Sequence, residues 1–140
     1  MILPLIEMQV YDPVSSYRVE PIGEIDVETD FPFSFAIKIF DDGLSGLNIE
    51  KGDILLFQDS WWPDVDEQIV LVCFENEEYY LRILHQMDSY GRLELRGTGD
   101  VSPIKTTKQS VIVKGVCCHV MKINYNQMQI IDTRTGEIII

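Results

Sequence analysis

Short runs of β-branched and aromatic residues, each ended by turn residues, most limit what this chain can fold into. Patterning with the 3.6-residue period of a helix is almost absent, whereas period-two alternation recurs at short intervals. From Phe33 to Ile39 every second residue is large and apolar, with Ser34, Ala36 and Lys38 between them. This alternation predicts a strand with one buried face, and the whole pattern predicts a mainly β fold of several short strands and hairpins.

Further strands are predicted wherever an apolar run meets turn residues. The ranges are 54–57, 68–74, 79–84, 92–96 and 111–123. Residues 75–77 turn the second of these runs into the third as a hairpin, and Gly115 predicts a bend in the last one. Residues 97–100 and Pro103 indicate a loop. Residues 127–131 and 136–140 predict a closing hairpin.

The length and composition favour a single domain. The chain has 140 residues, 46% of them hydrophobic, which is enough for one core. We divide it into an N-terminal arm at 1–32, a core at 33–123 and the C-terminal closing hairpin at 124–140. The arm is expected to be extended and to wrap the core, because four prolines interrupt any strand there: Pro4, Pro13, Pro21 and Pro32.

Charge narrows the classes of partner. The net charge of −12 repels phosphate backbones, so we expect no direct nucleic-acid contact by this chain. No apolar stretch is long enough for a membrane span, and residues 1–10 do not resemble a signal peptide, which predicts a cytoplasmic protein with no membrane partner.

The odd count of three cysteines without metal spacing, Cys73, Cys117 and Cys118, predicts buried reduced thiols.

Two segments of the predicted core carry a family resemblance. Asp42-Gly43-Leu44 follows a strand, and Gly52-Asp53 begins the next strand nine residues after Gly43. This arrangement resembles the C-terminal domain of LexA, UmuD and phage CI-type repressors, a mostly β fold also related to signal peptidases. In that family a Gly-Asp-Ser-Met type of turn carries a serine nucleophile, and a Gly-Asp follows about nine residues later. The serine position falls on Gly43.

The remaining parts of the resemblance lie on both sides of this turn. The family's lysine base lies near the end of a hairpin strand, and its position falls on Arg82. Residues 93–95 and 111–116 are similar to later family strands, which makes 33–123 a LexA-like core. Residues 3–6 and 17–21 resemble the self-cleavage segment, and the alignment places the scissile bond at Tyr11-Asp12. The family cleaves Ala-Gly or Cys-Gly, and this chain contains neither pair.

These replacements remove the chemistry of a Ser/Lys peptidase. Such a site needs a hydroxyl held against a neutral amine that can take its proton. Gly43 has no side chain, and Arg82 has no acceptor and stays protonated. The resemblance therefore implies a catalytically inactive dimerisation or regulatory domain of a bacterial or phage transcriptional repressor, whose DNA-binding helix-turn-helix lies upstream of Met1 or in a partner.

Other interpretations remain open. Ser45 is a candidate shifted nucleophile of an active self-cleaving serine peptidase, or a turn hydroxyl that caps backbone amides. Arg82 either fills the old cleft and pairs with Asp41 or Asp42, or is an exposed strand residue. The chain is alternatively a stand-alone, antirepressor-like interaction protein that pairs with an intact repressor domain.

Interface candidates are two tryptophans and the C-terminal isoleucines. Trp61 and Trp62 lie in a loop, where they either anchor a protein partner or fold one ring onto the core. Ile138, Ile139 and Ile140 present more apolar surface than an exposed edge strand tolerates, which favours a homodimer.

No cofactor or metal is expected from the sequence. His85 and His119 stand apart from any cysteine or carboxylate cluster, so we predict no metal site. Gly97-Thr98-Gly99 predicts a plain turn rather than a phosphate loop, because neither a helix pattern nor a lysine follows it.

Overall fold

The computed structural model describes residues 1–124 and 127–132, and it is mainly β, as predicted. Three 3-10 turns, Ser16–Arg18, Ser45–Leu47 and Lys108–Ser110, interrupt the strands. The strands are β1 (Ile2–Met8), β2 (Val14–Ser15), β3 (Gly23–Asp26), β4 (Phe35–Ile39), β5 (Ile54–Gln58), β6 (Gln68–Phe74), β7 (Glu78–Gln86), β8 (Arg92–Arg96), β9 (Ile104–Thr107), β10 (Val111–Asn124) and β11 (Gln127–Asp132).

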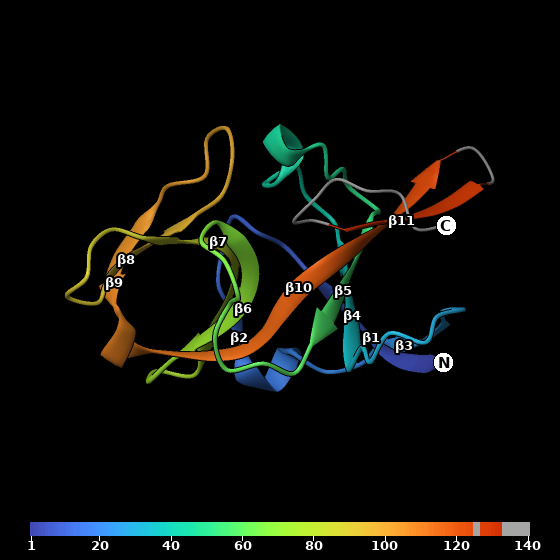
Figure 1. The fold of residues 1–140 in the computed structure, drawn as a ribbon, viewed down its shortest axis with the longest axis horizontal. Helices are drawn as coiled ribbons and strands as arrows, with labels where there is room; N and C mark the ends of the chain where they lie inside the picture. Colours follow the sequence, from blue (N-terminus) through green and yellow to red (C-terminus); the bar gives the residue numbers. More distant parts are fainter. Residues whose placement is uncertain (125–126, 133–140) are drawn as a thin grey trace.

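All strands of the described residues join one mixed sheet. Its order is β3-β1-β4-β5-β10-β6-β7-β8-β9, with β11 paired to β10 and β2 paired to β7. β1 and β4 are parallel, and the other pairs are antiparallel. The long β10 crosses the molecule and joins the β6–β9 part to the part formed by β1, β3, β4 and β5 (Figure 1). The chain is therefore a single domain, as predicted.

β10 serves both parts of the sheet because it is bulged. Its register shifts between Val113 and Gly115 against β6, and again between Cys117 and His119 against β5. The predicted bend at Gly115 is thus a β-bulge. A Cβ at Gly115 would lie 2.6 Å from Cζ of Phe35, so only glycine fits where β10 passes this ring.

The first 32 residues are more regular than their prolines suggest. They form three strands, and β1 is an interior strand of the sheet, between β3 and β4. Pro4 is tolerated there because the odd-numbered residues on both sides of it face the β3 segment: the Met1 carbonyl accepts the Val27 amide, and the Leu5 carbonyl accepts the Ile22 amide. The Pro4 nitrogen therefore faces β4, where paired residues begin only at Leu5.

Three other expectations need correction or fall outside the structure. β9 forms at 104–107, directly after the predicted loop and where the sequence predicted no strand, and it pairs with β8. β4 is covered on both faces rather than one, since Ile37 and Ala36 are both fully buried. β11 pairs with β10, and the predicted partner strand 136–140 lies outside the described residues.

The Gly52-Asp53 pair has a structural role at the start of β5. Gly52 adopts φ +96°, a left-handed conformation that favours glycine. The buried Asp53 carboxylate accepts the Glu50 amide at 2.8 Å and pairs with Lys122 Nζ of β10 at 2.6 Å. This acid therefore ties the turn to the shared strand.

Candidate functional site

The turn at Gly43 faces the segment that follows β1. A Cβ added at Gly43 would lie 2.4 Å from Cβ of Val10 and 2.8 Å from its Cγ1. Both residues are buried, and Val10 is completely inaccessible to solvent. Any side chain at the aligned nucleophile position would therefore displace Val10.

Asp41 holds the same segment by its backbone amides. Its Oδ2 accepts the N–H groups of Val10 at 2.7 Å and Tyr11 at 3.1 Å, and its Oδ1 accepts the Gly43 N–H at 3.0 Å. One carboxylate thus fixes the turn and the N-terminal segment together. Hydrogen bonds to a charged acceptor are stronger than neutral ones, which makes this an effective anchor.

Arg82 of β7 holds the carbonyls of these two residues. Its Nε donates to the Val10 carbonyl at 3.0 Å, and its Nη2 donates to the Tyr11 carbonyl at 3.0 Å. Nη1 donates to the carbonyls of Ser102 at 2.9 Å and Leu95 at 3.4 Å. We call Asp41, Arg82 and the bound Val10–Tyr11 backbone the clamp.

The Arg82 side chain is in the core rather than on the surface. The residue is only 2% exposed, and its guanidinium lies 5.5 Å from the centroid of the Tyr80 ring. Burial lowers the pKa of Arg82, and Tyr80, Asp41 and Asp12 oppose that shift through their charges. The exposed-strand interpretation is therefore wrong. Asp41 is close enough to act through its field, but the hydrogen-bond acceptors of Arg82 among the described residues are all main-chain carbonyls.

Thr98 closes the opposite side of the Gly43 turn. Its amide and its hydroxyl both donate to the Gly43 carbonyl, at 2.7 Å and 3.2 Å, and its Oγ1 accepts the Gly46 N–H at 3.0 Å. The Gly97-Thr98-Gly99 segment is thus a turn that braces another turn. The predicted turn is confirmed.

Ser45 stands at the surface beside the clamp. It begins the 3-10 turn Ser45–Leu47, and that turn has no side-chain cap. Its hydroxyl has no hydrogen-bond partner among the described residues, and the nearby Lys122 is paired with Asp53. A hydroxyl without a base lacks the activation that nucleophilic catalysis needs.

The two tryptophans of the loop between β5 and β6 behave differently. Trp61 is 77% exposed, whereas Trp62 is partly buried and packs on a core cluster that includes Val70 and Leu84. The Lys108 ammonium lies 4.6 Å from the Trp62 ring centroid and 6.0 Å from that of Trp61. One ring folds onto the core, as the second interpretation held, and the other remains available. Ile138, Ile139 and Ile140 lie outside the described residues.

The two histidines have unlike surroundings. His119 is buried, with its ring edge-on to Phe31 and Phe33 at centroid distances of 4.7 and 5.0 Å. His85 does not stand apart from carboxylates as expected, because the loop before β6 brings Asp66 and Glu67 beside it. Neighbours across a hairpin are not close in sequence, so spacing did not indicate this cluster.

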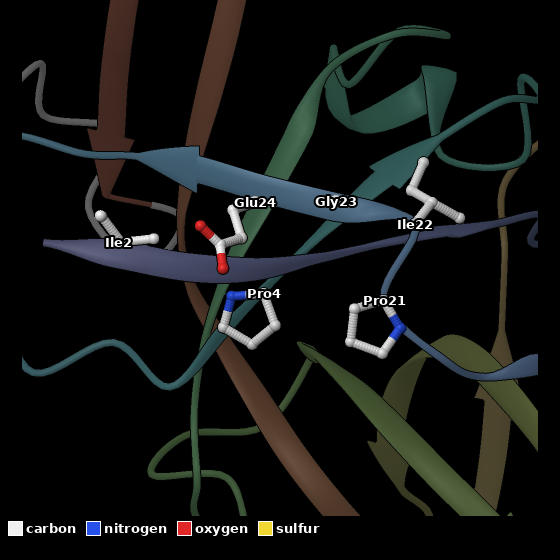
Figure 2. A pocket seen from close by; sticks show the side chains of 6 residues that line it. All are labelled: Ile2, Pro4, Pro21, Ile22, Gly23 and Glu24. Atoms are coloured by element: carbon white, nitrogen blue, oxygen red, sulfur yellow. The ribbon is translucent and has the colours of Figure 1, made fainter.

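An open hollow of about 440 Å³ lies at the end of the sheet formed by β3 and β1 (Figure 2). Residues of β1, β3 and the preceding segment line it: Ile2, Pro4, Pro21, Ile22, Gly23 and Glu24. Glu24 is the single charged lining residue, so the hollow lacks the convergent polar groups of a specific ligand site.

The sequence gives no signal for Val10 in the clamp or for Thr98 on the opposite side of the Gly43 turn, because neither residue belongs to a motif. It indicates Asp41 only as a partner for Arg82, whereas the structure shows Asp41 binding the amides of Val10 and Tyr11. The three cysteines are buried, as predicted, and none of them forms a disulfide with another described residue. No helix among the described residues is long and apolar enough to cross a membrane.

No protein-family model and no curated protein matches the sequence.

Proposed function

We propose that this chain is a non-catalytic, LexA-like dimerisation and regulatory domain of a bacterial or phage transcriptional repressor in the cytoplasm. The clamp is the observation that carries the first part of this proposal. The aligned nucleophile position has no side chain and no room for one, because Val10 lies against Gly43. The aligned base position is an arginine whose N–H groups are bound to backbone carbonyls.

The clamp also argues for a binding role over a cutting role. A peptidase cleft must admit and release a peptide, whereas here Asp41 and Arg82 fix both faces of one backbone segment. Val10 is fully buried beneath these contacts. A segment held in this way is part of the core and cannot leave to admit a substrate peptide. We therefore assign this domain a binding role, in which its outer surface contacts a partner.

Self-association is supported by one exposed side chain and by the sequence of the C-terminus. Trp61 is exposed in its loop, and the sequence ends in three consecutive isoleucines, at 138–140, a run more apolar than a solvated edge strand tolerates. The acidic chain contributes dimerisation while another segment or protein contacts DNA.

Prolonged incubation tests the loss of activity. The purified chain is kept at pH 9, below the range in which tyrosines ionise, and is followed by intact-mass spectrometry for several days. One unchanged mass is expected. Two discrete fragments, abolished by Ser45→Ala, would establish the peptidase alternative instead.

Sedimentation velocity over a range of concentrations tests dimerisation separately. A concentration-dependent dimer is expected, and a monomer throughout would refute that half of the proposal. Mixing with an intact repressor C-terminal domain then separates two roles. Heterodimers formed in preference to homodimers would favour the antirepressor-like alternative.

A further inference from the structure

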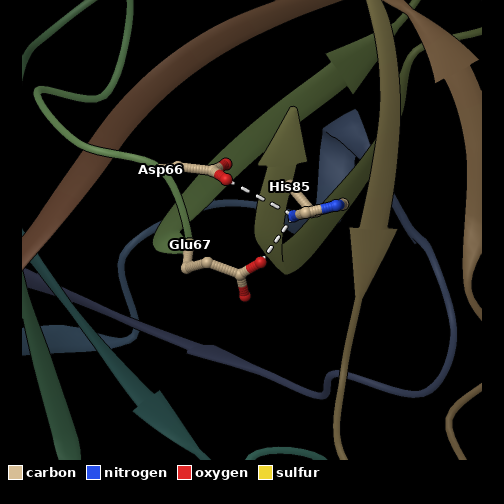
Figure 3. A group of neighbouring side chains, drawn as sticks. All are labelled: Asp66, Glu67 and His85. Atoms are coloured by element: carbon tan, nitrogen blue, oxygen red, sulfur yellow. Dashed lines mark ion pairs between the residues drawn. The ribbon is translucent and has the colours of Figure 1, made fainter. Parts of the chain in front are cut away.

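Three potential metal-ligand atoms converge at the open end of the β6–β7 hairpin. His85 lies near the end of β7, and Asp66 and Glu67 lie immediately before β6. His85 Nδ1 is 2.5 Å from Glu67 Oε1 and 3.4 Å from Asp66 Oδ2. Figure 3 shows both carboxylates approaching the same ring nitrogen, while the other ring nitrogen points away from them. The three ligand atoms all lie within 4.8 Å of one another.

The state of His85 Nδ1 distinguishes this cluster from a simple surface ion pair. The atom is shielded from solvent, yet it has no hydrogen-bond partner of acceptable geometry among the described residues. The two carboxylates therefore flank the direction in which Nδ1 can donate or coordinate, rather than lying along it. An ion in that direction would give this solvent-shielded nitrogen a partner.

We propose that His85, Asp66 and Glu67 bind one divalent transition-metal ion of the zinc class. Imidazole nitrogen and carboxylate oxygen are both zinc ligands, with bonds of about 2.0–2.2 Å. Two ligand atoms on a tetrahedral ion are then about 3.4 Å apart, which is the spacing of Nδ1 from Asp66 Oδ2. The Glu67 side chain, 51% exposed, can swing outward to open its shorter contact.

The hairpin backbone holds the ligands in place before an ion binds. The Gln86 amide donates to Asp66 Oδ1 at 2.8 Å and leaves Oδ2 to face the histidine. The Glu67 amide donates to the Leu84 carbonyl at 3.0 Å, which fixes this residue beside β7. Ligands fixed by such contacts lose little freedom on binding, and the protein supplies three of them, leaving a position for water or a partner's side chain.

Arg96 competes with the ion for Glu67. Its Nη1 lies 3.5 Å from Glu67 Oε1, the oxygen proposed as the ligand, while its Nε is bound to Glu94 at 2.7 Å. Removing the Arg96 charge should therefore strengthen metal binding. A clear gain in metal affinity on removing the Arg96 charge is specific to the proposed site, because the non-specific attraction of cations to an acidic chain would change far less.

Titration calorimetry with Zn²⁺ alone tests the site on the full chain. We expect one ion per chain at micromolar affinity, with His85→Gln weakening it by at least about tenfold and Arg96→Gln tightening it. Glu67→Gln should also weaken binding. Its matched control is Glu75→Gln, which should not, because Glu75 is an exposed acid at the other end of the same hairpin. Co²⁺ absorption should show a nitrogen and oxygen environment without thiolate bands.

Two results would overturn the proposal. The first is no saturable Zn²⁺ binding at concentrations up to a millimolar. The second is binding that His85→Gln and Glu75→Gln reduce equally, with circular dichroism showing that both variants are folded. Neither result bears on the regulatory role proposed above, because His85 lies outside the clamp.

Discussion

Arg82 and Val10 are joined by a hydrogen bond of 3.0 Å from the guanidinium Nε to the main-chain carbonyl, across 72 positions of sequence. The contact links β7 to the segment after β1, and Asp41 completes it by accepting the Val10 amide at 2.7 Å. A buried cation thus has its strongest contacts with neutral carbonyls. This arrangement makes Arg82 a structural residue whose replacement can be tested directly.

Arg82→Lys should lower the free energy of unfolding by about 2–4 kcal/mol. A lysine ammonium is a point donor that cannot reach carbonyls on three separate segments, so the buried carbonyl of Val10 or the partly buried carbonyls of Tyr11 and Ser102 would lose their partner. Urea denaturation followed by tryptophan fluorescence measures the change. Arg18→Lys is the control, because Arg18 is exposed and its guanidinium lies 5.9 Å from the centroid of the Tyr17 ring. Equal midpoints for the two variants would contradict the clamp.

Gly43→Ala should cost roughly 1–3 kcal/mol of stability through overpacking. The new methyl would lie 2.4 Å from Val10 Cβ, so the backbone on one side must move. Gly23→Ala is the matched control, because a Cβ there meets nothing within 4 Å. A double-mutant cycle with Val10→Gly should show that the pair costs less than the sum of the two single changes. Strict additivity would indicate that the two residues do not touch.

Much of the fold follows from local patterns in the sequence. Gln68–Phe74 and Arg92–Arg96 form strands with the predicted bounds, because apolar runs between turn residues decide such strands locally. β1 and β9 were missed for a different reason. A proline at position 4 and a short polar stretch at 104–107 argue against strands, and only their neighbours β4 and β8 provide the pairing.

The sequence predicts which catalytic groups the candidate site lacks but not which contacts replace them. The missing serine and lysine follow from the residue types at positions 43 and 82 alone. What replaces it depends on packing: Val10 reaches Gly43 because β1 lies parallel to β4 in the sheet. The His85 cluster is similarly set by the β6–β7 register, in which Gln68 faces Leu84.

Stability should decline above about pH 10, where unfolded tyrosines ionise. Burial is the main cause that raises the pKa values of Tyr79 and Tyr80, and a hydrogen bond with Asp42 is the main cause for Tyr11. From pH 10 upward the unfolded state therefore binds fewer protons than the folded state, so the free energy of unfolding falls as pH rises. Below that range these tyrosines leave stability unchanged.

Denaturation midpoints measured from pH 8 to pH 11 check this slope. Tyr79→Phe should reduce it, whereas Tyr90→Phe, at a residue 87% exposed, serves as the control. Tyrosinate absorbance should also rise at a higher pH in the native protein than in urea. A native titration that coincides with the one in urea would refute the prediction.

The two adjacent tryptophans should separate stability from association. Trp62→Ser should cost about 2 kcal/mol of unfolding free energy, because it exposes part of the cluster with Val70 and Leu84 and removes the ring facing Lys108. Trp61→Ser should leave stability nearly unchanged, since that side chain is largely exposed. If Trp61 anchors the proposed dimer, the same change should raise the dimer dissociation constant by more than about tenfold in sedimentation equilibrium, as expected for a tryptophan at the centre of an interface. Undisturbed dimerisation would remove Trp61 from the interface and leave the C-terminal isoleucines to account for it.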